Sequence, residues 1–358
     1  MKAVSGDLTD PKARASYETL YDACPTAFVQ QSADWAEVIG PIGPALPRFL
    51  VCLDGEDLVA GLPLYLYRGP GGAVLVSVPQ AGPFGGILIR PDLPERARLE
   101  AYGVLVEAAL EAARGEGCLA LTVMTNPFAP DLALYETLLS PDFVLESYTQ
   151  FLRLDAPAHR SHGHRSNLNR ARKSGLAVSF SGDARELGEW LSIHRERHSA
   201  LGLDPLPARL FENALHVLAP RDRARLLLVR KGERIVSGGF YMRHRDLVDV
   251  YMLSTSGEGM EMAANFLNSD HSMASFREAG ARVYHWQSSP GRASGVYQYK
   301  KQWGSEERPY HFLTRLLVDR KKIQELGPEG VRRGYPGHFV VPFAAFEKGF
   351  DAKYFRKE

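Results

Sequence analysis

The sequence predicts an α/β (α+β) protein with two successive parts, each a mixed, mostly antiparallel sheet flanked by helices. The chain has 358 residues, which is enough for two domains that each bury a core of their own. Apolar residues make up 45% of the chain and charged residues 24%, values typical of globular proteins rather than disordered ones. The predicted order of strands and helices in the first half also parallels the order in the second half.

Composition and charge restrict the classes of function. The formal net charge is +1, so contact with a nucleic acid would depend on a local basic patch. The cysteines, Cys24, Cys52 and Cys118, are odd in number and far apart, which fits neither a disulfide framework nor a metal knuckle. We therefore expect a reducing, cytoplasmic setting. The first 16 residues contain no apolar h-region, and no uninterrupted apolar run approaches 18 residues, so we also expect neither a signal peptide nor a membrane span.

The first half reads as alternating strands and helices. Apolar residues flank the polar tetrad that begins at Asp54, which predicts a hairpin with its turn near Asp54 and Gly55. Pro94 and Gly115 mark the start and end of an amphipathic helix. The other predicted elements are a short helix at 28–40, strands at 118–124 and 143–155, and a helix at 131–139.

Two glycine-rich stretches of the first half resemble phosphate loops. They run from Gly69 to Gly72 and from Gly82 to Gly86. Neither has the GK[ST] ending of a phosphate loop, and neither leads into a helix. We interpret both as turns between strands.

The second half is predicted to begin after a junction at residues 155–159. Residues 225–254 contain apolar runs interrupted near Lys231-Gly232 and again at residues 243–246, which predicts three antiparallel strands. A helix follows within residues 255–280, with Gly280 in the position of a C-terminal cap. The remaining predicted elements are helices at 183–202 and 205–218, a strand at 281–288, and an aromatic and basic segment at 295–309.

Residues 159–173 form a basic segment without a single acidic residue. One interpretation is a helix whose charged face is solvated. The other is an anion site for an acceptor phosphate or a tRNA backbone, because arginine suits phosphate oxygens. Arg165, Asn169 and Arg172 or Lys173 would share one helical face, so a compact site is sterically possible.

A pair of histidines in the predicted helix 183–202 has the spacing of metal ligands. His194 and His198 lie one turn apart with Glu196 between them, which is HxExH order rather than the HExxH of zinc proteases. No third ligand is marked. We expect no metal, and we interpret His194 as a packing or substrate-groove residue.

Four sequence features resemble one known family. They are the small-residue doublet in IVSGGFYM, the helix and strand of residues 263–286, the Tyr299-Lys300 and Trp303-Gly304 pairs of YQYKKQWG, and the basic stretch HRSNLNRARKSGLAV. Together these are similar to the FemAB-like branch of the GNAT acyltransferases, with its BioF2-like relatives, over roughly residues 30 to 318. The resemblance implies tandem GNAT-like lobes: an N-terminal lobe at 1–156, a C-terminal catalytic lobe at 157–320, and an extension at 321–358.

The resemblance also implies roles for individual residues. Lys300 would stabilise the negative charge that develops during acyl transfer, and Tyr299 would shape the pocket around it; an ordinary amphipathic helix end is the alternative. Tyr297 lies where many GNAT enzymes carry a general-acid tyrosine. Further substrate-binding candidates in the cleft are Asp249, Tyr251 and His285.

Donor phosphates are expected at the N-terminus of the helix that begins near Glu258, where unpaired amides and the helix dipole favour an anion. The candidate amides belong to Gly257, Gly259, Met260 and Met262. The stretch SGEGMEMA departs from the family's Q/R-x-x-G-x-G/A signature. Its acidic residues, Glu258 and Glu261, weaken an acetyl-CoA interpretation, because carboxylates repel a pyrophosphate.

The function predicted by the resemblance is a transferase that forms an amide on an amine-bearing small molecule or peptide. The donor would be an aminoacyl-tRNA or an acyl-CoA, used as a co-substrate, with no tightly bound cofactor. We expect a cytoplasmic monomer or weak dimer that binds tRNA if the donor is tRNA-borne. The alternative is a non-catalytic GNAT-fold protein that binds RNA or a nucleotide partner.

Overall fold

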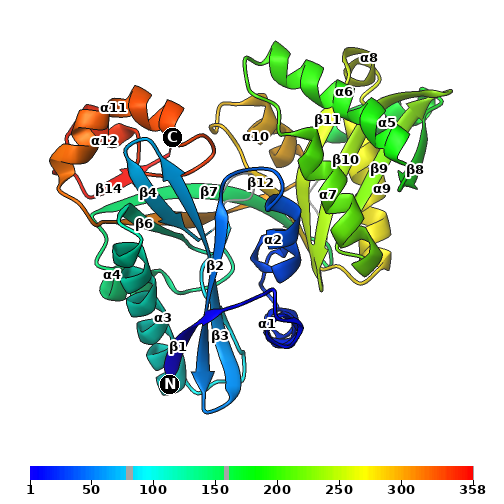
Figure 1. Cartoon of the computed structure of the whole chain (residues 1–358). Helices are drawn as coiled ribbons and strands as arrows, with labels where there is room; N and C mark the ends of the chain where they lie inside the picture. The colour runs from blue at the N-terminus through cyan, green and yellow to red at the C-terminus, as the bar shows by residue number, and fades with distance from the viewer. Residues whose placement is uncertain (78–83, 157–160, 358) are drawn as a thin grey trace. The chain divides into compact units, whose positions relative to one another are not determined.

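The computed structural model describes residues 1–77, 84–156 and 161–357, and these form two compact units (Figure 1). Unit 1 contains Met1–Tyr148 and Pro309–Glu358, and unit 2 contains Thr149–Arg308. The units therefore divide the chain after Tyr148 and Arg308, whereas the sequence predicted divisions after residues 156 and 320. Because compactness does not test which pieces fold on their own, the lobe boundaries 1–156 and 157–320 stay a prediction.

Unit 1 is built on a mostly antiparallel sheet. Its strands follow the order β1-β2-β3-β4-β6-β13, with β5 beside β3 and with β14 beside the first part of β7. The pairs β4 with β6 and β14 with β7 are parallel. The strands are β1 (Lys2–Gly6), β2 (Leu46–Asp54), β3 (Asp57–Gly69), β4 (Gly72–Val76), β5 (Leu88–Ile89), β6 (Cys118–Met124), β7 (Phe143–Arg153), β13 (Glu306–Leu316) and β14 (Tyr354–Arg356).

Helices cover both faces of this sheet because neighbouring strand residues point to opposite sides. In β4, Leu75 packs with α3 and α4, whereas Val74 packs with α11 and α12. Residues 321–357, for which the sequence predicted no role, thus complete the second core of unit 1. The helices of this unit are α1 (Pro11–Ala23), α2 (Ala33–Ile39), α3 (Glu95–Gly115), α4 (Leu132–Leu139), α11 (Arg320–Gly334) and α12 (Ala344–Lys348), with a short 3-10 turn at Val29–Gln31.

Unit 2 has a mixed sheet in the order β7-β12-β11-β10-β9-β8, to which β7 contributes its second part. Only the β11–β12 pair among these neighbours is parallel in the described part of the chain. Its elements are α5 (His162–Lys173), β8 (Ala177–Ser181), α6 (Ala184–Ala200), α7 (Ala208–Leu218), β9 (Ala224–Lys231), β10 (Arg234–His244), β11 (Leu247–Thr255), α8 (Gly257–Glu261), α9 (Ala264–Glu278), β12 (Val283–Ser288) and α10 (Gly295–Gln302), with a 3-10 turn at Ala219–Arg221.

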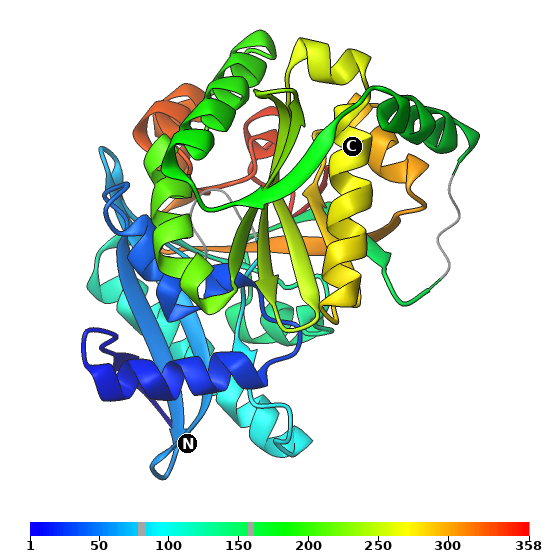
Figure 2. The same ribbon diagram turned by 90° about the vertical axis from the view of Figure 1, so that its right-hand side faces the viewer.

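The glycine doublet of β10 lets helices approach both faces of the sheet in unit 2. A Cβ on Gly238 would lie 2.4 Å from Trp190 of α6, and one on Gly239 would lie 2.6 Å from the ring of Tyr241, which packs on Phe276 of α9. Figure 2 shows α9 on one side of these strands and α6 with α7 on the other. The doublet therefore serves close packing of Trp190 and Tyr241.

Most predicted elements are confirmed. The predicted fold class, tandem GNAT-like lobes with mostly antiparallel sheets and flanking helices, is confirmed. The two hairpin turns of β9–β11 contain Gly232 and Arg245 at φ +59° and +53°. Gly280 caps α9 at φ +88°, because its N–H bonds the carbonyl of Arg277 while the N–H of Ala281 bonds that of Phe276.

The helix predicted to begin near Glu258 is two helices. Ala263 has a left-handed backbone at φ +56°, which interrupts the helical hydrogen bonds, and the long helix begins at Ala264. Residues 69–72 form the predicted turn between β3 and β4, with Gly72 at φ +138°. The second glycine stretch lies partly outside the described residues.

Candidate active site

Helix α10 carries the three predicted catalytic residues, and one serine fixes its first turn. The Ser294 hydroxyl accepts the N–H of Tyr297 at 3.2 Å and donates to the carbonyl of Gly291 at 2.6 Å. Tyr297 and Lys300 are three residues apart and share one side of the helix, whereas Tyr299 points elsewhere.

The Lys300 ammonium is buried and fully hydrogen-bonded. Its Nζ donates to the carbonyl of Gln287 at 3.0 Å, to that of Ser288 at 2.8 Å and to Ser289 Oγ at 2.9 Å, and the residue is 5% exposed. An ammonium has three N–H donors, so these acceptors use all of them. A buried charge is tolerated when hydrogen bonds replace its hydration in this way. Here the ammonium holds two carbonyls and one hydroxyl together at the end of β12.

The end of β12 is irregular, which aims its carbonyls at Lys300. Gln287 has a left-handed backbone at φ +60°, and the pairing of β12 with β7 shifts register between His285 and Ser288. The pairing of β12 with β11 ends at Asp249 and His285, although β11 continues to Thr255. The two parallel strands therefore separate beside Lys300.

A chain of hydrogen bonds marks the point where the strands separate. Asp249 Oδ1 lies 2.8 Å from His285 Nδ1, and His285 Nε2 lies 2.6 Å from Thr149 Oγ1, all three side chains being buried. Burial and the nearby Lys300 lower the pKa of His285 against the opposing effect of Asp249. A neutral His285 thus donates from Nδ1 to Asp249 and accepts the Thr149 hydroxyl at Nε2.

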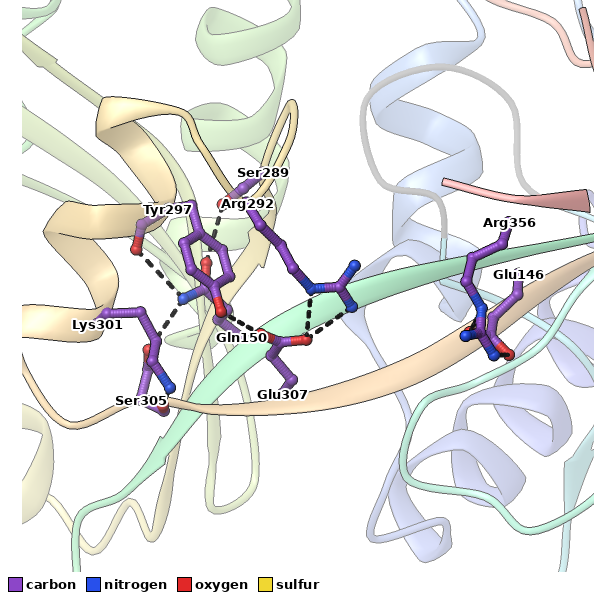
Figure 3. Close-up of polar contacts among 9 residues, drawn as sticks. All are labelled: Glu146, Gln150, Ser289, Arg292, Tyr297, Lys301, Ser305, Glu307 and Arg356. Carbon is purple, nitrogen blue, oxygen red and sulfur yellow. Dashed lines mark hydrogen bonds and ion pairs between the residues drawn. The ribbon is translucent and has the colours of Figure 1, made fainter. Parts of the chain in front are cut away.

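Gln150 links this region to α10 and to Ser305, the residue before β13 (Figure 3). Its Oε1 accepts the hydroxyl of Ser289 at 2.9 Å, while its Nε2 donates to Ser305 Oγ at 3.1 Å and to the carbonyl of Tyr297 at 3.4 Å. Gln287 in turn donates to Asp249 Oδ2 at 2.5 Å. We call Asp249, His285, Thr149, Gln150, Gln287, Ser289, Lys300 and Ser305 the polar network.

Sequence reasoning identified three members of the polar network, Asp249, His285 and Lys300, and missed the others. Gln150 could have been noticed as an amide within the strand YTQFL, where a fully buried side chain (0% exposed) needs a partner. Ser289 and Ser305 carry no such signal, because serines in loops are common.

Tyr297 ends in a charged cluster at the edge of the polar network (Figure 3). Its hydroxyl donates to Glu307 Oε1, and Arg292 donates to Glu307 Oε2 at 2.9 and 3.3 Å. Although burial opposes ionisation of Glu307, the hydrogen bonds from Tyr297 and Arg292 lower its pKa. Sequence reasoning proposed Tyr297 but not its carboxylate partner.

Tyr299 connects α10 to α9. Its hydroxyl donates to the carbonyl of Asn265 at 3.0 Å and lies 2.8 Å from Ser269 Oγ, and its ring packs edge-on against Phe266 and Trp286. Burial raises the pKa of this phenol, which keeps it protonated. These contacts hold α10 in place; a pocket-shaping role for Tyr299 stays a prediction.

Three of the four predicted phosphate-binding amides of the α8 turn have acceptors within the protein. The N–H of Gly259 bonds Ser256 Oγ, that of Met260 bonds the Ser256 carbonyl, and that of Met262 bonds the Glu258 carbonyl, at 2.9 to 3.2 Å. Gly257 is exposed and has open space around it. A phosphate would have to replace internal bonds to reach the amides of Gly259, Met260 and Met262, and binding at this turn stays a prediction.

Residues 162–173 of the basic segment form the helix α5, whose predicted face is exposed, whereas residues 159 and 160 lie outside the described residues. Arg165, Asn169, Arg172 and Lys173 are all exposed, and Arg172 bonds Asp270 of α9 at 2.9 Å. Neither the solvated-face interpretation nor the anion-site interpretation is tested by this arrangement.

His194 and Tyr251 lie in an aromatic cluster beside α6 and α7. His194 Nε2 accepts the N–H of Leu206 at 3.2 Å, and its Nδ1 lies 3.3 Å from Ser254 Oγ. Burial lowers the pKa of His194 to about 4. Tyr251 packs against Phe211. In the described part of the chain, no three His, Cys, Asp or Glu side chains are grouped so as to hold a metal ion.

Comparison with known proteins agrees with this architecture. Residues 158–301 match the acetyltransferase (GNAT) domain family. A search of the curated proteins found no match. Across the described residues, no helix has both the length and the apolar character needed to cross a membrane.

Solved structures extend the similarity to most of the chain. FemX superimposes with a TM-score of 0.70 at 16% identity, covering 91% of this chain and 99% of FemX. L-PGS from Bacillus licheniformis gives a TM-score of 0.58 at 14% identity, with 92% and 98% covered. A tandem GNAT protein from the clavulanic acid biosynthesis pathway gives 0.54 at 13% identity, with 89% and 99% covered. Residues 158–301 therefore resemble the GNAT acetyltransferase domain family, and the chain as a whole has a fold similar to that of FemX and of the tandem GNAT protein.

Proposed function

We propose that this protein transfers an acyl or aminoacyl group to an amine and forms an amide bond. The observation that carries the proposal is the buried Lys300 at the point where β11 and β12 separate. Strands that diverge leave backbone groups without a strand partner, and an extended acyl arm of the donor can pair there. The family match of residues 158–301 to acyltransferases supports the same reaction class.

Lys300 would act on the oxyanion of the transition state. Attack by the amine turns the acyl carbonyl into an oxyanion, and a fixed ammonium in a cleft of low dielectric stabilises this charge more than the neutral carbonyl. One of its three acceptors, such as Ser289 Oγ, would exchange for the substrate oxygen. Tyr297 would serve as the proton-transfer group beside it.

We favour a tRNA-borne aminoacyl donor over an acyl-CoA. The amides of Gly259, Met260 and Met262 are engaged within the protein, and Glu258 adds a carboxylate at the turn where a pyrophosphate would bind. The exposed basic face of α5 offers an alternative contact for a nucleic-acid backbone. The tandem GNAT relative, whose description mentions AcCoA, keeps acyl-CoA as the second donor class.

The acceptor would be an amine-bearing small molecule or peptide. We also propose that the protein has no tightly bound cofactor, that it is cytoplasmic, and that it is a monomer or a weak dimer. A non-catalytic GNAT-fold protein that binds RNA or a nucleotide is the second candidate. The observation in its favour is that protein acceptors use all three N–H groups of Lys300.

A donor screen tests the proposal. The purified protein is incubated with a pool of amine acceptors and with either an acyl-CoA panel or a panel of charged tRNAs, and mass spectrometry follows amide products. We expect an amide product with charged tRNA that Lys300→Met reduces strongly. Formation of product from acyl-CoA alone would reverse the donor preference, and no product with either panel would support the non-catalytic candidate.

A further inference from the structure

Glu307 is a charged residue at the edge of the site, and the proposed transfer reaction gives it no role so far. It lies at the start of β13, where its side chain is 28% exposed, and it contacts Tyr297 of α10 and Arg292 of the preceding loop. Tyr297 itself is 8% exposed, so the hydrogen bond joins a buried phenol to a carboxylate that reaches solvent. This edge is where a proton can leave the site.

The direction of the Tyr297 hydrogen bond matters for its chemistry. An ionised carboxylate only accepts hydrogen bonds, so the phenol proton of Tyr297 points toward Glu307. The phenol oxygen also has lone pairs, through which it can accept a proton. A tyrosine held in this way can take a proton from an amine only if it passes its own proton to Glu307.

Helix α10 places Tyr297 one turn before Lys300. Tyr297 and Lys300 lie on the same side of α10, and Gln150 holds the Tyr297 carbonyl while it also accepts Ser289, a partner of Lys300. These contacts fix the backbone of α10 at Tyr297 beside the polar network that holds Lys300, and Glu307 fixes the phenol. A carboxylate linked to that phenol is placed for proton transfer.

We propose that Glu307 is a positioning residue that orients Tyr297 and accepts its phenol proton during transfer. This inference rests on the proposed function. The amine nitrogen bonds to the acyl carbon, and the bond from that carbon to its carrier oxygen or sulfur breaks. The amine proton moves to Tyr297 Oη as the phenol proton moves to Glu307 Oε1, and the reverse transfers then protonate the leaving group.

The charges around Glu307 set the pH at which this relay works. The charged and titratable groups that face it are Tyr297 and Lys301 of α10 and Arg292 of the loop before α10. Burial opposes ionisation, but the hydrogen bonds of Tyr297 and Arg292 outweigh it and lower the pKa of Glu307. The carboxylate is thus present at neutral pH, and the rate should fall as the pH drops through this lowered pKa.

Glu307→Gln tests the relay, because glutamine keeps the shape and the acceptor oxygen but cannot take a proton. We expect kcat to fall by about 10²-fold, the scale of general acid–base catalysis, with little change in KM and without the acidic limb of the wild-type pH profile. Glu306→Gln is the matched control, because it removes the same charge from the exposed neighbouring residue. It should leave both kcat and the pH profile unchanged.

A measurement that needs no turnover accompanies the kinetics. Carbon-13 NMR of glutamate carboxyls should show that Tyr297→Phe raises the pKa of Glu307, since this variant removes a hydrogen bond that favours the carboxylate. An unchanged Glu307 pKa, or a Glu307→Gln enzyme with wild-type kcat and pH profile, would overturn the relay alone. Absence of transfer with every donor would overturn the proposed function and the relay with it, even if the NMR shift is seen.

Discussion

The end of β12 and the α8 turn both follow a strand of the same sheet, yet their polar groups are used differently. At the end of β12, Gln287, Ser288 and Ser289 direct oxygen atoms at the side chain of Lys300. At α8, Ser256 accepts the amides of Gly259 and Met260. In the first region, neutral oxygen atoms surround the ammonium of Lys300, whereas the second region satisfies its own backbone amides.

This difference teaches where chemistry is to be expected in a fold of this kind. A charge held by several polar groups in a buried site is preorganised to stabilise another charge that appears beside it. A short turn whose amides already have hydrogen-bond acceptors has few free N–H groups to bind an anion. The predictions below, taken from the largest expected effect to the smallest, would sharpen this contrast or break it.

Substitution of Lys300 should give the largest effect. Removal of one oxyanion-stabilising group costs about 3 to 4 kcal/mol, or two to three decades in rate, so Lys300→Met should lower kcat and kcat/KM together while donor affinity is nearly retained. Lys301→Met should change kcat little at neutral pH, because its Nζ donates to the carbonyl of Ser305 at 3.3 Å and contacts none of the Lys300 acceptors. If Lys300→Met raises only KM, the lysine is a binding group. Circular dichroism is needed alongside, since the variant leaves buried carbonyls without a donor.

The pH dependence of stability distinguishes His194, whose hydrogen-bond partners are neutral, from the polar network, which contains charged residues. The folded pKa of His194, about 4, lies below the unfolded value of about 6.5, so the unfolded state binds the extra proton between these values. Stability should therefore fall as pH decreases from about 6.5 to about 4, by roughly 3 kcal/mol for this residue. Urea unfolding at several pH values measures the decrease.

His194→Gln should remove most of that pH dependence, whereas His216→Gln, at an exposed position of α7, should retain it. A wild-type slope in His194→Gln would place the acid-sensitive group elsewhere, with His285 of the polar network as the next residue to substitute.

Two glycines of α8 test whether this turn is packed rather than built for a ligand. A Cβ on Gly259 would lie 2.2 Å from the carbonyl oxygen of Val236, whereas one on Gly257 meets no atom within 4 Å. Gly259→Ala should lower the free energy of unfolding by about 1 to 3 kcal/mol, the usual range for overpacking, and Gly257→Ala should change it little. Equal stabilities would show that the turn adjusts easily and is free to open for a phosphate.

The smallest effect is expected on the basic face of α5. If this face binds the donor tRNA, Arg165→Ala with Arg172→Ala should weaken binding and reduce the log-log salt slope by about one unit for each phosphate that the variant no longer binds. Filter binding over a series of salt concentrations measures both quantities. Unchanged affinity and slope would leave α5 as a solvated face, and Lys12→Ala on the exposed surface of α1 serves as the control.

The sequence predicted most of the fold because its signals are local. The hairpin turns at Gly232 and Arg245 and the cap at Gly280 lie beside the apolar runs that they end, so pattern and turn chemistry agree. The break at Ala263 was missed because alanine favours helix. In the folded chain Ala263 has a left-handed backbone, and Gly259 of the preceding helix packs closely on Val236.

The candidate site was predicted only in part. The sequence pointed to Lys300, Tyr297, Asp249 and His285 because their side chains are ionisable. Their roles remain predictions. Gln150 and Glu307 lie on strands that only the folded sheet brings to α10. No spacing rule in the sequence connects them, since their association is created by the sheet order.

The most direct test of the central claim, that Lys300 marks the transfer centre, is to find where the transferred group binds. A donor identified in the transfer screen is prepared with a photoreactive acyl group, bound, illuminated and mapped by peptide mass spectrometry. We predict that the label falls on residues 283–302, which hold the end of β12 and α10, and that Lys300→Met retains this labelling while transfer is slow. A label confined to residues 256–262 of the α8 turn, or to unit 1, would contradict this claim.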